Sequence, residues 1–192
     1  MYAIIEWAKR KGFKKILLED ASQIQCLNTK MPISYSLYYG YILQSGYPWY
    51  WKFGFRYEEE ILNTKLEENK RKLDGLRVES LGFEDLVDML IKKIELERYI
   101  DSCSSFSFRK TRTSALDSDM LDNKNMLRNI GKMSEVYKRH IFDENVYEFF
   151  REMYIECCEI MGLITLNLSR GLGIHEVRGP TIDEVKRMVL LL

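Results

Sequence analysis

The order of local signals in residues 2–20 constrains the fold of this chain more than any other feature. YAIIEWAKRKGF (2–13) has apolar residues at helical spacing, then a basic run and Gly12, the usual pattern of an amphipathic helix and its C-terminal stop. KKILLED (14–20) follows as an apolar run of strand length that ends in acids. A helix, a glycine turn and a strand in this order predict half of an α/β unit.

The mixed pattern continues to about residue 81. A loop is expected at 21–33 and a helix from about Ser34, and PWYWKFGF has Pro48 and Gly54 where a short helical turn would begin and end. EEEILNTKLEENKRK (58–72) is highly charged and is expected to be solvated. Strands are predicted on either side of it, near residues 55–57 and 75–81.

From Gly82 onward, apolar residues recur mainly at helical spacing. Within this region, LITLNLS (163–169) is the exception, because its pattern is typical of a strand. Thr181 and Glu184 make a capping box for a last helix. His140 lies at a helix C-terminus, where a cation favours the helix dipole, so a structural role is expected for it. The helices predicted in this part begin at about residue 82 and span about 120–140, 143–161 and 181–192.

The fold class that follows is α+β and helix-dominated. We expect a partial α/β region at residues 1–81 and a mainly helical region at 82–192. A Ser/Thr-rich stretch at about 101–119 reads as a loop or linker within the second region.

Composition narrows the classes of function. Lysine plus arginine equals aspartate plus glutamate, 29 each, so no net charge attracts nucleic acid or an anionic membrane. No apolar run approaches the roughly 18–20 residues of a membrane helix, and no signal peptide is evident. The four cysteines have no CxxC spacing and are expected to be free thiols, with no metal site. A cytoplasmic protein is therefore expected.

Two motifs within residues 2–57 resemble a known family. IIEWAKRKGFKKILLEDAS (4–22) presents an AK..G helix that leads into a strand, and WYWKFGF ends in Gly-Phe with Tyr50 four residues before Gly54. In this order the motifs resemble the C-terminal half of the GNAT N-acetyltransferase superfamily. The residues of these motifs are especially similar to those of acetyltransferase-like proteins of large DNA viruses. A protein of that kind would be located in the host cytoplasm.

The resemblance implies acetyl-CoA as cofactor and transfer of its acetyl group to an amine, without a metal. Tyr50 would be the catalytic acid that returns a proton to the coenzyme A thiolate, since a phenol is protonated at neutral pH. Leu17, Leu18 and Glu19 would belong to the strand that lines the cleft for the pantetheine arm. Either Glu19 or Asp20 could also serve as a base for the amine, since adjacent residues on a strand face opposite ways, although a solvated strand end is the favoured interpretation.

The resemblance places the family's pyrophosphate-binding loop before residue 1, so whether this chain is an active enzyme stays open here. SRGLGIHEVRGP (169–180) matches that loop only in part, and a plain turn is the favoured interpretation. The alternatives are a non-catalytic interaction or structural protein built on the half-fold, and a true start of the gene upstream of Met1. The half-sheet would expose an edge, which predicts self-association or a protein partner there.

Overall fold

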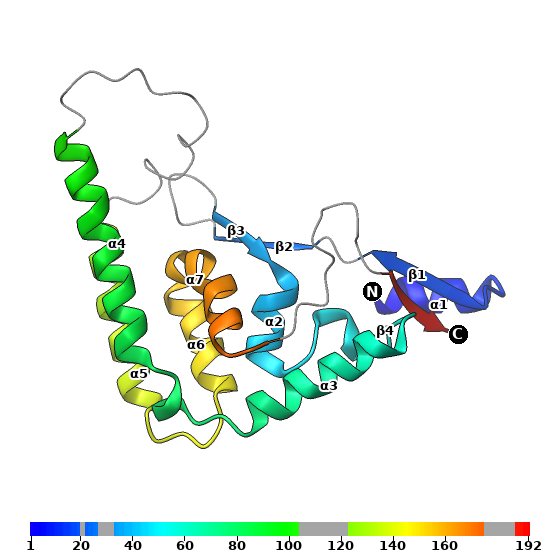
Figure 1. Ribbon diagram of the computed structural model, residues 1–192. Helices are drawn as coiled ribbons and strands as arrows, with labels where there is room; N and C mark the ends of the chain where they lie inside the picture. Colours follow the sequence, from blue (N-terminus) through cyan, green and yellow to red (C-terminus); the bar gives the residue numbers. More distant parts are fainter. Residues whose placement is uncertain (20–21, 27–32, 104–122, 175–186) are drawn as a thin grey trace.

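A small sheet-containing part and a larger helical part share one apolar core (Figure 1). The computed structural model describes residues 1–19, 22–26, 33–103, 123–174 and 187–192. Both chain ends lie in the sheet-containing part, and helices dominate the rest, which agrees with the expected α+β class.

The sheet-containing part combines segments from both ends of the chain. Helix α1 (Tyr2–Arg10) and strand β1 (Lys15–Glu19) confirm the predicted helix, glycine turn and strand. Strand β5 (Arg187–Leu191) lies between β1 and β4 (Arg56–Tyr57), and both pairings are antiparallel. The helix predicted over 181–192 is therefore wrong for residues 187–191. The capping box lies outside the described residues.

Strand β5 is stabilised by pairing with β1 on one side and with β4 on the other. Val189 is the register partner of both Leu17 on β1 and Arg56 on β4, so β5 satisfies the backbone groups of two strands at once. Met188 is fully buried, and Ile16 and Leu18 pack against the same core. One face of the sheet is therefore covered, and the other carries the alternate side chains of β1 and β5.

Helix α2 (Leu37–Ser45) lies between the two parts of the molecule (Figure 1). It packs against α6 (Tyr147–Glu156), α7 (Cys158–Gly171) and α3 (Glu60–Asp74), and its Tyr38, Ile42 and Leu43 are fully buried. It ends at Gly46, which has φ 82°, and a Cβ there would clash with the side chain of Lys70.

A two-stranded hairpin precedes α2. Strand β2 (Gln23–Cys26) pairs antiparallel with β3 (Ile33–Ser36). The predicted loop at 21–33 is therefore wrong at 23–26 and at residue 33, while 21 and 27–32 lie outside the described residues. The helix predicted from about Ser34 begins only at Leu37, because 34–36 belong to β3. Both strands pack against α7, which gives their short pairing a buried surface.

The charged stretch after β4 is a helix with one buried face. Helix α3 (Glu60–Asp74) buries Leu62, Leu66 and Leu73, which recur at helical spacing. The expectation of a solvated segment is wrong for this face. The strand predicted at 75–81 is also wrong, because a 3-10 turn, η2 (Val78–Ser80), buries Val78 there instead.

In the described ranges from residue 83 onward, the larger part consists of the helices α4 to α7, and most of them follow the predicted periodicity. The interpretation of 163–169 as a strand is wrong, because this segment belongs to α7 and packs among helices. The predicted helix at 143–161 is interrupted at Cys157, whose φ of −126° separates α6 from α7. Residues 104–122, which hold most of the expected linker, lie outside the description. The bounds are α4 (Phe83–Cys103), α5 (Asn123–His140), α6 (Tyr147–Glu156) and α7 (Cys158–Gly171).

Candidate functional site

The aromatic turn at 48–55 is a 3-10 helix, η1 (Trp49–Phe53), between Pro48 and Gly54, as predicted. Gly54 has φ 90°, and a Cβ on it would lie 3.0 Å from Leu190 Cδ1 on β5. A glycine is therefore needed both for the left-handed backbone and for the close approach of the sheet.

Trp49 contacts two other rings of this turn edge to face, and Trp51 stacks on Tyr47 instead. Trp49 lies 4.9 Å from both the Tyr50 and the Phe53 ring, measured between centroids. Phe55 is fully buried beneath Tyr50, and Lys52 Nζ lies 4.6 Å from the centre of the Trp49 ring. These ring contacts therefore stabilise the turn, which borders the apolar core. Lys52 adds a cation–π contact at its solvent-facing edge.

Tyr50 is the member of this turn that combines burial with a polar contact. Its side chain is only 8% exposed, and its hydroxyl lies 2.7 Å from the hydroxyl of Ser22, just before β2. The hydrogen bond fixes the direction of the phenol, because the ring is already held by Trp49 and Phe55. Sequence spacing did not predict Ser22 as its partner.

Leu17, Leu18 and Glu19 lie on β1 beside a shallow hollow of about 460 Å³, which Arg187 completes. Leu17 is 47% exposed, and Glu19 forms an ion pair with Arg187 at 3.5 Å. The hollow offers apolar surface and one guanidinium. Tyr50 is not among the residues that line it, so the two halves of the predicted site do not form one cavity. Asp20, the neighbour of Glu19, lies outside the described residues.

A disulfide that the sequence did not predict joins the hairpin to the helical part. Cys26 on β2 and Cys158 at the start of α7 are bonded, with Cα atoms 5.9 Å apart. The expectation of free thiols is wrong for these two residues. It holds for Cys157, which is buried and whose pKa is raised by burial to about 11. No spacing rule could have found a pair separated by 132 residues.

The disulfide lies in the wall of an open polar hollow of about 510 Å³ between β2, α5 and the α6–α7 junction. Arg128 and Lys132 contribute positive charge, and Glu156 and Glu159 contribute negative charge. Asn129 donates a hydrogen bond to Glu159 at 2.8 Å. Charges of both signs line the surface, so it has no strong preference for an anion or a cation.

His140 has the structural role that its position predicts. It ends α5, and its two ring nitrogens contact Asp143, at 2.6 Å, and Glu152. Burial alone would lower the pKa of His140, but the hydrogen bonds and charges of the two carboxylates outweigh it and raise the pKa. The imidazole therefore ties α5 to α6.

Neither a metal centre nor a membrane span is found in the described parts of the chain. There, no three histidine, cysteine, aspartate or glutamate side chains come together as metal ligands. Within the same ranges, no helix has both the length and the apolar character needed to cross a bilayer. Comparison with models of protein families, with curated proteins and with solved structures finds no significant match to this chain.

Proposed function

We propose that the chain is an acetyltransferase-like protein in which Tyr50 donates the proton needed when an acetyl group passes from acetyl-CoA to an amine. The observation that supports this most is the phenol of Tyr50, held by two rings and directed by the Ser22 hydroxyl 2.7 Å away. A proton donor whose orientation is already fixed loses little entropy when it acts. The helix, glycine turn and strand of α1 and β1, and the aromatic turn after α2, also follow the order of the resemblance, and the strands β2 and β3 come between β1 and α2.

The residues on β1 fit part of the cofactor. Bound acetyl-CoA would supply an activated carbonyl and a thiolate leaving group. Leu17 and Leu18 offer apolar surface for a pantetheine arm, and the outer edge of β1 offers backbone groups for its amides. For the phosphates, the hollow offers Arg187, which is already paired with Glu19. These residues therefore fit the arm better than the diphosphate.

Calorimetry of acetyl-CoA with the 192-residue chain tests the cofactor first. Binding that can be saturated is expected, and the absence of any binding heat at about 1 mM ligand would remove the enzyme proposal for this chain. Acetyl transfer to a panel of primary amines then tests the reaction.

Tyr50→Phe tests the proton donor. Loss of a general acid lowers turnover by about 10²- to 10⁴-fold and leaves KM nearly unchanged. Tyr47→Phe is the matched control, because it removes a phenol hydroxyl that binds Glu67 at 2.9 Å on the surface beside the same turn. Equal turnover of wild type and Tyr50→Phe would refute the role of Tyr50.

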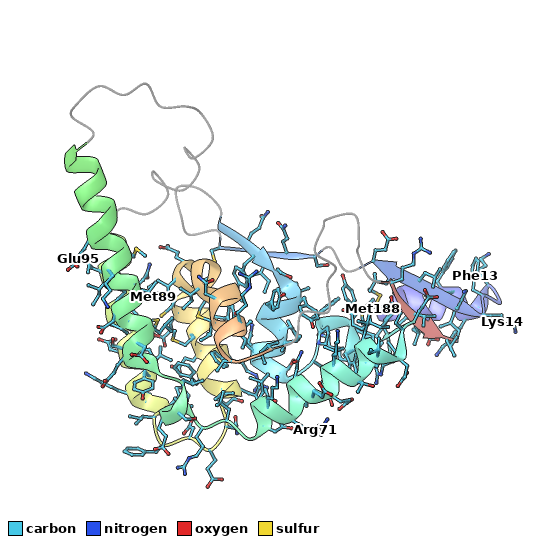
Figure 2. All side chains as sticks on the ribbon, in the orientation of Figure 1. Phe13, Lys14, Arg71, Met89, Glu95 and Met188 are labelled. Atoms are coloured by element: carbon cyan, nitrogen blue, oxygen red, sulfur yellow. A yellow bond between two sulfur atoms is a disulfide. The ribbon has the colours of Figure 1, made fainter. Side chains whose placement is uncertain are left out.

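A second candidate, a non-catalytic interaction protein, is favoured by the outer surface of α1. Ile4 and Trp7, one helical turn apart, are both more than half exposed, and Phe13 packs beside Trp7 with ring centroids 5.6 Å apart. Figure 2 shows Phe13 at the far end of the sheet-containing part. Exposed apolar side chains that gather on one helix are typical of a protein-binding surface. Failure to bind acetyl-CoA would favour this candidate.

A further inference from the structure

Strand β1 is an edge strand. The sheet order is β1-β5-β4, so β5 covers one side of β1, and among the described residues no strand pairs with its other side. Figure 1 shows β1 on the side of β5 that faces away from β4. An uncovered edge presents a row of backbone N–H and C=O groups that can pair with another strand.

The sequence of β1 is complementary to itself when the strand is reversed. In Lys-Ile-Leu-Leu-Glu (15–19), a positive charge and a negative charge flank three apolar residues. An antiparallel copy centred on Leu17 places Lys15 opposite the partner's Glu19 and Glu19 opposite the partner's Lys15. Ile16 then faces the partner's Leu18. Opposite charges and apolar pairs directly across an antiparallel ladder are stabilising.

The side chains of the exposed face extend this pattern across the strands. Glu19 is already paired with Arg187 on β5, so the partner's Lys15 would place a second cation on the free side of the carboxylate. Leu17 has Val189 as its β5 neighbour, and it is 47% exposed. In the paired sheet this leucine would contact its own copy, which would cover part of that surface.

We propose that two copies of this chain associate through β1, antiparallel and centred on Leu17, so that two three-stranded sheets become one continuous sheet across a twofold axis. The symmetry is of the isologous kind, in which the same patch serves both subunits and every contact occurs twice. Two ion pairs and two Ile16–Leu18 contacts therefore surround one central leucine pair.

The charges of β1 do not protect the edge against this pairing. Protective edges carry lysines or buried charges that repel an identical strand. Here the two charges have opposite signs and lie at equal distances from the centre, so reversal of the strand matches them. A parallel pairing in register would instead bring Lys15 near the partner's Lys15 and Glu19 near the partner's Glu19. The charge pattern thus selects the antiparallel orientation.

This inference goes beyond the proposed acetyl transfer and does not depend on it. Self-association is measured without acetyl-CoA, so a dimer that binds no cofactor would leave the inference intact. If both proposals hold, the cofactor arm and the partner strand use the same edge of β1. Added acetyl-CoA would then lower the dimer fraction.

Sedimentation velocity of the full chain over a concentration series tests the pairing. We expect a species of about 46 kDa, twice the 22.9 kDa of one chain, to grow with concentration. Lys15→Glu and Glu19→Lys should each weaken dimerisation by about tenfold or more, because each turns two ion pairs into two repulsive contacts. Circular dichroism and the unfolding midpoint verify that both variants fold as the wild type does.

Restoration of the matching charges gives the sharpest outcome. The double variant Lys15→Glu/Glu19→Lys should bind itself more tightly than either single variant, although the lysine introduced at position 19 then lies beside Arg187, which costs part of the wild-type affinity. An equimolar mixture of the two single variants should form a heterodimer, because one chain is then acidic and the other basic at both positions. A wild-type chain that stays at 22.9 kDa up to about 1 mM overturns the inference. A dimer that neither single variant weakens, or a double variant that dimerises no better than the single variants, overturns it as well.

Discussion

Removal of the bond between Cys26 and Cys158 should lower the free energy of unfolding by several kcal/mol. The two residues are 132 positions apart, so the bond closes a loop that spans more than half of the chain. For a loop of this length the chain-entropy relation gives about 5 kcal/mol, and native disulfides contribute about 2–5 kcal/mol in practice. A domain with a total stability of about 5–15 kcal/mol would lose a large fraction of it.

Urea unfolding with and without a thiol reductant measures the loss. The double variant Cys26→Ala/Cys158→Ala should show the lower stability under both conditions. Cys157→Ala is the matched control, because Cys157 is also buried but forms no disulfide. This control should lose only about 1 kcal/mol, for the removed sulfur, and it should still respond to reductant. Both Cys26 and Cys158 should escape alkylation in the unreduced, denatured chain.

The reasoning fails if the wild type unfolds at the same urea concentration in oxidised and reduced form. It also fails if both cysteines are alkylated without prior reduction. If the reductant changes only the slope of the unfolding free energy against urea concentration, the disulfide acts on the compactness of the unfolded chain.

Two further predictions concern contacts between helices. The pKa of His140 is raised above its ordinary 6.5 by Asp143 and Glu152, so the stabilisation is complete below about pH 6.5 and is lost as the pH rises through the folded-state value. Unfolding free energies measured against pH should show this slope, and His140→Gln should remove it. Tyr154→Phe deletes a buried hydrogen bond of 2.8 Å to Thr165, and thermal or urea unfolding should register a loss of about 1 kcal/mol. An unchanged pH slope in the first case, or unchanged stability in the second, would contradict these assignments.

The parts of the fold that local signals specify were predictable. Gly12 stops α1, Pro48 and Gly54 bracket η1, and apolar residues at helical spacing mark α4 and α5. Each of these signals acts within a few residues along the chain, through backbone conformation or the side chains of one face. The leucines of α3 also recur at helical spacing, but the many charged residues between them led to the prediction of a solvated segment.

The location of Tyr50 on a turn was predictable from the sequence, but the residues that contact its hydroxyl were not. The sequence placed Tyr50 on a turn before Gly54 and Leu17–Glu19 on a strand, and both placements are confirmed. Ser22 lies 28 residues away from Tyr50 in sequence, and only the packing of the hairpin brings the two hydroxyls together. The catalytic role of Tyr50 stays a prediction.

The sequence by itself determined where most helices and turns lie, because helix periodicity, glycine stops and proline starts are local properties. The tertiary structure decided the segments whose local signals were ambiguous. RMVLL became β5 because β1 and β4 both lacked a partner, and LITLNLS became part of α7 because it packs among helices. The Cys26–Cys158 bond likewise required the hairpin to reach the start of α7. Short apolar runs fit a helix or a strand equally well, so their neighbours in space make the choice.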